Sequence, residues 1–267
     1  MKQTIFILSA AHSGSTLLDL MIGSHPECFS LGEFCHVEQI IRGSRTCSIC
    51  GEMCDFWSRF RERVDPPEYH QCASECAGDK ILIDSSKQLD WQKRSIANID
   101  RFLVIDLRRI CYGALLYKLS KGDGIRRKDV EKWVRTRKEI DNHVRWLGAN
   151  ALSVNYEDLC EDPETVLNRI CKFISIDFDP CMLKFWEGDH HICGGNGKPV
   201  RLIKQHRGLP VSDPANKGPI TQKFHETTGF EIKPDYRYKE FMHQSQIEMI
   251  NQVAGRIMRR YKYRVEV

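Results

Sequence analysis

The stretch that most constrains the fold lies at the start of the chain, where an apolar run meets small residues and then a helical pattern. Residues 5–8 contain no polar side chain, as expected for a strand buried on both faces of a parallel sheet. Residues 9–16 are small or polar, and apolar residues then recur at helical spacing from Leu17 to Ile22. Such a strand–loop–helix turn directs backbone N–H groups and the positive helix end toward one point. The turn therefore predicts an anion site suited to phosphate or sulfate.

Common nucleotide-binding motifs do not account for this turn. A P-loop of nucleotide triphosphatases needs a Gly-Lys-Ser/Thr ending, and no lysine is present here. A dinucleotide fingerprint needs three spaced glycines, whereas the turn contains only Gly14. For the loop alone, a serine cluster that caps an ordinary helix remains an alternative.

Three further apolar runs predict strands that end in polar or charged residues. The run at 80–83 leads to Asp84-Ser85-Ser86-Lys87, the run at 101–105 leads to Arg108 and Arg109, and the run at 151–154 leads to Tyr156. Helical patterns separate these runs, including residues 129–147 and a helix from Asp162 to about Ile174. We therefore predict the α/β class: one P-loop-like domain with a central parallel sheet flanked by helices.

The 267 residues suffice for one such domain, and we assign residues 1–267 to it. Within it, residues 34–78 form a cysteine-rich insertion, residues 206–231 an irregular acceptor loop, and residues 235–263 a C-terminal helix. No apolar stretch approaches the roughly 20 residues of a membrane span, and Met1-Lys2 is followed by a strand rather than by a signal peptide. We expect a cytoplasmic protein without membrane insertion. A net charge of +4 does not favour nucleic acid, and no feature indicates an oligomeric state.

Seven of the twelve cysteines lie between residues 28 and 76. Cys47, Cys50 and Cys54 have the spacing of a zinc knuckle, with His70, Cys72 and Cys76 as possible further ligands. No second Cys-x-x-Cys follows to complete a four-ligand site. His190 and His191 stand beside Cys193, but adjacent histidines rarely point at one centre, and a nucleotide-covering loop is the preferred interpretation. We therefore expect packed free thiols and no metal.

Taken in order, these segments resemble the sulfotransferases that use PAPS (3′-phosphoadenosine 5′-phosphosulfate), including bacterial, carbohydrate and protein-tyrosine sulfotransferases. The 5′-phosphosulfate loop of that family reads Lys/Arg-Ser-Gly-Thr/Ser-Thr/Ser-Leu-Leu, and residues 12–18 read His-Ser-Gly-Ser-Thr-Leu-Leu here. The resemblance implies that the cofactor contacts come from Ser13, Gly14, Ser15, Thr16 and Leu17.

The resemblance also implies catalytic roles. Glu33 matches the family glutamate that removes the acceptor's proton, and Lys87 matches a lysine beside the transferring sulfuryl group. His12 stands where the family loop has Lys or Arg. Either Lys87 supplies the positive charge alone, or His12 acts only when protonated, or catalysis is impaired.

The implied nucleotide contacts match the family less closely. The family holds the 3′-phosphate with an arginine and a serine after the strand at 101–106, and here only Arg108 and Arg109 are candidates. Tyr156 belongs to a Tyr-Glu-Asp-Leu phrase near the nucleotide. Asn196 and Arg201 belong to the Gly-Gly-Asn loop and the basic segment that follows it.

The reaction implied by the resemblance is transfer of a sulfuryl group from PAPS to a hydroxyl-bearing acceptor, which is a sugar, a lipid or a small alcohol. PAPS is the expected co-substrate, and no metal is expected. Two alternatives remain: a kinase-like P-loop protein, which the missing lysine disfavours, and a non-catalytic nucleotide- or metal-binding protein of the same fold.

Overall fold

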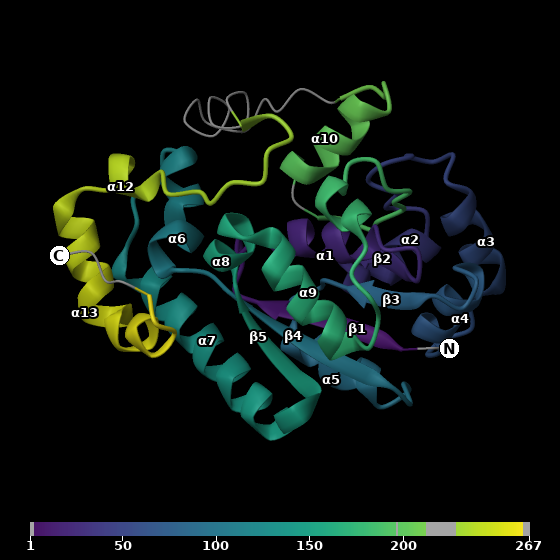
Figure 1. The fold of residues 1–267 in the computed structure, drawn as a ribbon, viewed down its shortest axis with the longest axis horizontal. Helices are drawn as coiled ribbons and strands as arrows, with labels where there is room; N and C mark the ends of the chain where they lie inside the picture. The colour runs from purple at the N-terminus through teal and green to yellow at the C-terminus, as the bar shows by residue number, and fades with distance from the viewer. Residues whose placement is uncertain (1–2, 196, 212–227, 264–267) are drawn as a thin grey trace.

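A sheet of five parallel strands forms the centre of the computed structural model, which describes residues 3–195, 197–211 and 228–263 (Figure 1). In sequence order the strands are β1 (Thr4–Ser9), β2 (Cys28–Gly32), β3 (Ile81–Asp84), β4 (Phe102–Arg108) and β5 (Ala151–Asn155). Their order across the sheet is β2-β3-β1-β4-β5, and β1 pairs with β3 on one side and β4 on the other. The predicted α/β class with a parallel sheet is confirmed.

Helices cover both faces of this sheet. They are α1 (Ser15–Gly23), α2 (Val37–Ile41), α3 (Asp55–Arg63), α4 (Tyr69–Cys76), α5 (Leu89–Ile96), α6 (Cys111–Ser120), α7 (Arg127–Leu147), α8 (Tyr156–Glu161), α9 (Pro163–Ile174), α10 (Gly197–His206), α12 (Tyr238–Phe241) and α13 (Gln244–Arg260). Short 3₁₀ turns occur at Phe34–His36, Gly148–Asn150 and Pro180–Lys184. None of the described helices combines the length and the apolar character that crossing a bilayer needs.

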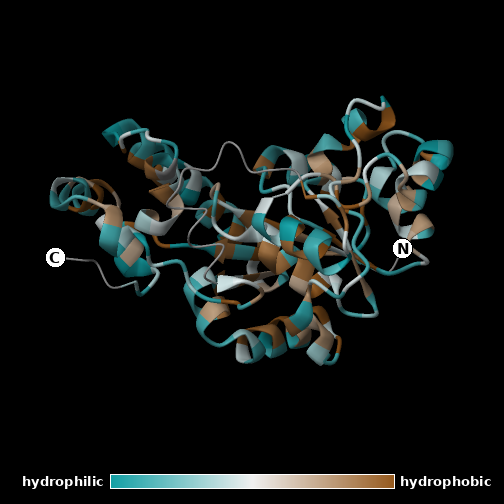
Figure 2. Ribbon diagram, turned by 90° about the horizontal axis from the view of Figure 1, so that it is seen from above, coloured by the Kyte–Doolittle hydropathy of each residue, from teal (hydrophilic) through white to brown (hydrophobic). Residues whose placement is uncertain are grey.

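The apolar run of β1 contributes to a hydrophobic core on each face of the sheet because side chains alternate along a strand. Ile5 and Ile7 pack in the core that contains α1, whereas Phe6 and Leu8 pack on the opposite face with residues of α7. All four are at most 1% exposed. Figure 2 shows the hydrophobic residues gathered around the central strands. This double burial explains why the run carries no polar side chain.

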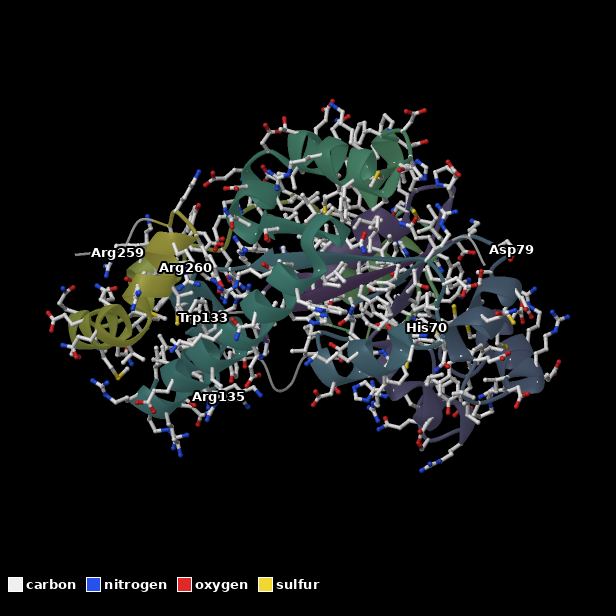
Figure 3. All side chains as sticks on the ribbon, turned by 90° about the horizontal axis from the view of Figure 1, so that it is seen from below. His70, Asp79, Trp133, Arg135, Arg259 and Arg260 are labelled. Carbon is white, nitrogen blue, oxygen red and sulfur yellow. The ribbon has the colours of Figure 1, made fainter. Side chains whose placement is uncertain are left out.

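The predicted helices at 129–147 and 162–174 correspond to α7 and α9. Asp162 caps α9 by accepting a hydrogen bond from the Thr165 backbone N–H at 3.2 Å. Helix α13 lies beside α7, where Arg260 pairs with Asp141 at 3.3 Å (Figure 3). This packing closes the end of the molecule opposite α3 and α4 (Figure 1).

The insertion at 34–78 contains α2, α3 and α4, which the sequence analysis did not predict. Helix α3 is only nine residues long and buries Phe56, Trp57 and Phe60, so its periodic pattern is too short to be distinct. In Figure 3, His70 marks the position of α4 beside the sheet.

The structure describes the helix predicted at 235–263 but only part of the loop predicted at 206–231. Most of the predicted loop at 206–231 lies outside the described residues, since 212–227 are not described. The predicted helix at 235–263 is divided into α12 and α13. His243 is the N-cap of α13, and its backbone N–H donates to the Gln246 side chain at 3.1 Å, as in a capping box.

Candidate active site

The carboxyl ends of the five strands lie at one edge of the sheet because all five run in parallel. The first loop, residues 10–14, follows β1. Glu33 follows β2 directly, Arg109 follows β4 and Tyr156 follows β5, while Lys87 is the third residue after β3. The topology therefore brings together residues that are far apart in the sequence.

These residues line a cavity of about 500 Å³. Of the predicted site residues, its lining contains His12, Gly14, Ser15, Thr16, Leu17, Glu33, Lys87, Arg109 and Tyr156. The lining also holds six lysines and arginines against three carboxylates. A mainly cationic cavity of this size suits a polyanionic small molecule.

The first loop approaches Tyr156 too closely for any side chain at position 14. Gly14 has φ 88° at the N-cap of α1, and a Cβ there would lie 2.4 Å from Cδ2 of Tyr156. Gly14 makes no side-chain cap hydrogen bond to α1, and the N–H groups in the first turn of a helix point toward a position that suits an anion. Ser13 Oγ is buried and has no hydrogen-bond partner within the described part of the chain.

His12 is uncharged near neutral pH in this arrangement. Its ring stacks on Tyr117 with a centroid distance of 3.8 Å and an interplanar angle of 25°. Burial against the cavity wall, together with the charges of Arg109, Lys87 and Lys121, lowers the pKa of His12 to about 4. The side chain at the position of the family's Lys or Arg therefore adds no charge before a ligand binds.

The second loop, residues 85–87, places Lys87 in direct contact with Glu33. The Lys87 ammonium group donates to a Glu33 carboxylate oxygen, and His36 Nε2 lies 3.7 Å from the other oxygen. Lys87 has φ 65° and His12 has φ 60°, a left-handed conformation that is uncommon for residues other than glycine. Both strand-end loops thus hold one such residue at the cavity, as functional sites often do.

A buried carboxylate organises the second loop. Asp84 accepts hydrogen bonds from the Ser86 backbone N–H at 3.0 Å, from His70 Nε2 at 3.0 Å and from Trp91 Nε1 at 2.8 Å. These contacts tie the loop to α4 and α5. The sequence analysis identified the Asp-Ser-Ser-Lys phrase but not this role for its aspartate.

A second buried carboxylate, Asp19 on α1, joins the two loops. Asp19 accepts hydrogen bonds from Ser30 of β2 at 2.5 Å and from Ser85 at 2.8 Å. Burial raises the pKa of Asp19 to about 7, although the two hydrogen bonds oppose the shift. The helix that starts at the first loop is thereby fixed to the second loop. Nothing in the sequence pattern marked Asp19.

Arg109 and Arg108 point in different directions. Arg109 donates to the His12 carbonyl at 2.7 Å, pairs with Asp235 at 3.2 Å and stacks over the Tyr156 ring at 4.4 Å. Arg108 instead pairs with Asp106 at 2.8 Å, and it does not line the cavity. Side chains two residues apart share a face of a strand, which explains the Arg108–Asp106 pair.

Ser13 and Arg201, two further predicted residues, are not among the lining residues of the cavity. Arg201 is on α10, and Asn196 lies outside the described residues. The roles of all these residues stay predictions.

Several charged residues of the cavity were not predicted as site residues, namely Lys121, Lys198, Lys233, Asp235 and Arg237. Burial lowers the pKa of Lys198 to about 8, and Asp235 partly opposes this shift. Burial disfavours ionisation of Asp235, but hydrogen bonds from Arg237 and the charge of Arg109 outweigh it and lower the Asp235 pKa. Lys198 follows the Gly-Gly-Asn phrase, so the sequence carried a signal for it. The others come from segments with no motif.

Comparison with known proteins yields matches among solved structures alone. No family model and no curated protein matches the chain. The sulfotransferase domain from the curacin biosynthetic pathway is 21% identical, with 100% of this chain and 99% of that domain covered and a TM-score of 0.59. The sulfotransferase domain of the Synechococcus PCC 7002 olefin synthase is also 21% identical, with 84% and 94% covered and a TM-score of 0.52. The likeness spans the central sheet and its flanking helices, and the chain therefore has the sulfotransferase fold.

Proposed function

We propose that the protein is a sulfotransferase that moves a sulfuryl group from PAPS to a hydroxyl group of an acceptor. The observation that carries this proposal is the convergence of the first loop, Lys87 and Glu33 on one cavity at the carboxyl edge of the sheet. The likeness in fold to two sulfotransferase domains supports the same reaction class.

The residues of the cavity fit a polyanionic nucleotide. Ser13 is not itself a lining residue, but it lies between the lining residues His12 and Gly14 and has a buried hydroxyl that lacks a partner among the described residues. The excess of lysine and arginine in the lining offsets much of the negative charge of a phosphosulfate and a second phosphate. PAPS supplies the activated sulfuryl group, and the protein's own groups supply binding and proton transfer.

The first loop and Lys87 hold the negatively charged oxygens. Backbone N–H groups at the start of α1 are fixed donors, and the helix end adds a partial positive charge. Lys87 contributes a full charge from the neighbouring strand end. Preorganised donors of this kind stabilise charge that develops during group transfer.

Glu33 acts as the general base. An acceptor hydroxyl has a pKa far above neutral, so its proton must leave as the sulfuryl group arrives. The contact with Lys87 holds the Glu33 carboxylate at the cavity before an acceptor binds. When a sulfuryl group draws Lys87 toward its oxygens, the Glu33 carboxylate becomes available to the acceptor.

We assign the nucleotide's second phosphate to other cations of the cavity lining. Arg109 donates to the His12 carbonyl and pairs with Asp235, so we assign it a structural role in the cavity wall. Lys121, Lys198 and Lys233 lie in the same lining. Lys198 donates to Thr228 at 2.6 Å and Lys233 pairs with Glu231 at 2.7 Å, so a phosphate would compete with these two contacts. A phosphate near Lys198 would restore its charge above pH 8 by raising its pKa.

The test compares ligands and then follows transfer. Calorimetric titration with adenosine 3′,5′-bisphosphate, the product form of PAPS, should show tighter binding than titration with ATP. Incubation with PAPS and a mixture of sugar, lipid and phenol or alkanol acceptors should release the bisphosphate and form a sulfated product detected by mass spectrometry. Tighter binding of ATP would favour the kinase-like alternative. Binding of the bisphosphate without transfer to any acceptor class would favour a non-catalytic protein.

A further inference from the structure

A cluster of three cysteines and one histidine lies outside the cavity, and the proposed function does not use it. The ligand atoms of Cys47, Cys50, Cys54 and His191 all lie within 4.8 Å of one another. Nδ1 of His191 is 3.3 Å from Sγ of Cys50 and 3.3 Å from Sγ of Cys54. The cysteines come from the insertion, whereas His191 comes from the segment before α10, so only the folded chain assembles the group.

These separations suit one tetrahedral metal ion. Zinc–sulfur bonds of about 2.3 Å and zinc–nitrogen bonds of about 2.0 Å place neighbouring ligand atoms about 3.5–3.8 Å apart. The closest sulfur–nitrogen pairs are slightly nearer than this, and the widest pair is within 4.8 Å. Small side-chain rotations would bring all four atoms to bonding distance of one centre.

In the turn at residues 47–51, a backbone N–H group points at a cysteine sulfur. The Cys50 backbone N–H points at Sγ of Cys47 over 3.4 Å, and the Gly51 N–H donates to the Cys47 carbonyl at 3.0 Å. Hydrogen bonds from backbone N–H groups stabilise a thiolate, the form of cysteine that binds metals.

His191 is oriented as a ligand by a neighbouring carboxylate. Its Nε2 lies 3.2 Å from Asp189, and Asp189 is paired with Arg207 at 3.0 Å. A metal-binding histidine commonly donates its other ring N–H to a carboxylate, which fixes the tautomer and directs the lone pair to the metal. Here that arrangement leaves Nδ1 facing the three sulfur atoms.

We propose that Cys47, Cys50, Cys54 and His191 bind one Zn²⁺ ion as a structural site. A closed set of three thiolates and one imidazole is a common structural zinc environment, and none of the four residues lines the cavity. The sequence analysis favoured free thiols because no fourth ligand follows the three cysteines nearby. His191 supplies that ligand from 137 positions beyond Cys54.

The ion would fasten the insertion to the segment that adjoins the active site. Cys193 donates to the Leu31 carbonyl and accepts from the Glu33 backbone N–H, each at 2.8 Å. Trp57 Nε1 donates to the His191 carbonyl at 2.6 Å, and Ser48 N–H donates to the Ile192 carbonyl at 2.9 Å. The segment 191–193 is thus held between the zinc site and the end of β2. The zinc assignment itself does not depend on the proposed reaction.

Metal analysis of the full chain, purified reduced and without added zinc, tests the proposal. We expect about one equivalent of zinc per chain. Cys50→Ser and His191→Gln should each retain at least about tenfold less zinc after dialysis against a chelator. Cys181→Ser is the matched control, because a serine hydroxyl can replace the thiol that donates to the Ser24 carbonyl at 3.1 Å. This control should keep the wild-type zinc content.

Cobalt substitution provides a second readout that does not require folded variants. Co²⁺ added to the reduced wild-type chain after zinc removal should produce the intense visible bands of a tetrahedral thiolate site, and zinc should abolish them. Stoichiometric iron with an iron–sulfur spectrum, or a disulfide between two of the three cysteines in the freshly isolated chain, would overturn the assignment. Absence of zinc together with absence of cobalt bands would also overturn it.

Discussion

The two strand-end loops of the candidate site differ in what they offer a ligand. The first loop, after β1, offers backbone N–H groups around Gly14, and its His12 side chain is uncharged because its pKa lies near 4. The second loop, after β3, offers the charged side chain of Lys87, already paired with Glu33. The two loops therefore have different roles in the site: the first binds a ligand through backbone dipoles, and the second supplies a charged side chain.

Of the substitutions that test the two loops, replacement of Lys87 should have the largest effect on turnover. Lys87→Ala should reduce turnover about 10²–10³-fold and weaken binding of the bisphosphate as well, because a cation beside a polyanion stabilises both bound and transition states. Kinetics and calorimetry on the same preparation measure the two effects. Lys93→Ala, an exposed lysine on α5, is the control. If Lys87→Ala keeps the turnover of the wild type, the charge does not come from Lys87.

A side chain introduced at position 14 tests whether the backbone N–H groups of the first loop bind the ligand. Gly14→Val would meet Tyr156 and obstruct the loop N–H groups, so bisphosphate binding should weaken by about 2 kcal/mol or more, roughly 30-fold. Gly43→Val is the matched control, since Gly43 has φ 70° and no atom within 4 Å of a Cβ. Thermal unfolding of both variants separates strain from binding. Equal affinity in folded Gly14→Val and wild type would contradict the role of this loop.

Protonation of His12 should make the affinity for a polyanionic ligand depend on pH, an effect of intermediate size. A bound polyanion raises the pKa of His12 from about 4, so a proton is taken up on binding and affinity falls as pH rises through the raised value. The slope is at most about tenfold per pH unit. His12→Lys should remove this part of the slope and bind more tightly at neutral pH. Calorimetric profiles that coincide for the two proteins would show that His12 stays uncharged in the complex.

Asp19, which joins the two loops, is expected to affect the stability of the fold and to have the smallest effect on ligand binding. Its folded pKa of about 7 exceeds the ordinary carboxyl value, so its contribution to stability is fully present below about pH 4 and is lost as pH rises through 7. Asp19→Asn should remove a slope of up to about 1.4 kcal/mol per pH unit between pH 5 and 7. Urea unfolding at several pH values measures it, with the exposed Asp123→Asn as control. Identical slopes in Asp19→Asn and wild type would mean that Asp19 is ionised in the folded protein.

The sequence predicted the parts of the site that local pattern and topology determine. The apolar runs identified β1, β3, β4 and β5, and parallel strands necessarily bring Lys87, Arg109 and Tyr156 to one edge, where Glu33 also lies after β2. It did not predict contacts that depend on distant packing. Asp19 meets Ser85 across 66 positions, and His191 meets Cys54 across 137, so no spacing rule connects them. Arg108 was selected together with Arg109, although strand alternation separates the two side chains.

The most direct test of the account is turnover of PAPS by Glu33→Gln. Turnover is measured as release of the bisphosphate together with formation of the sulfated acceptor. Glutamine keeps the shape of the side chain but cannot accept the proton, so turnover should fall about 10²–10⁴-fold. Bisphosphate affinity should stay the same or increase, because a negative charge beside Lys87 is removed. Glu38→Gln, an exposed glutamate on α2, should behave as wild type. Full sulfuryl transfer by folded Glu33→Gln would contradict the account and assign the base to another group.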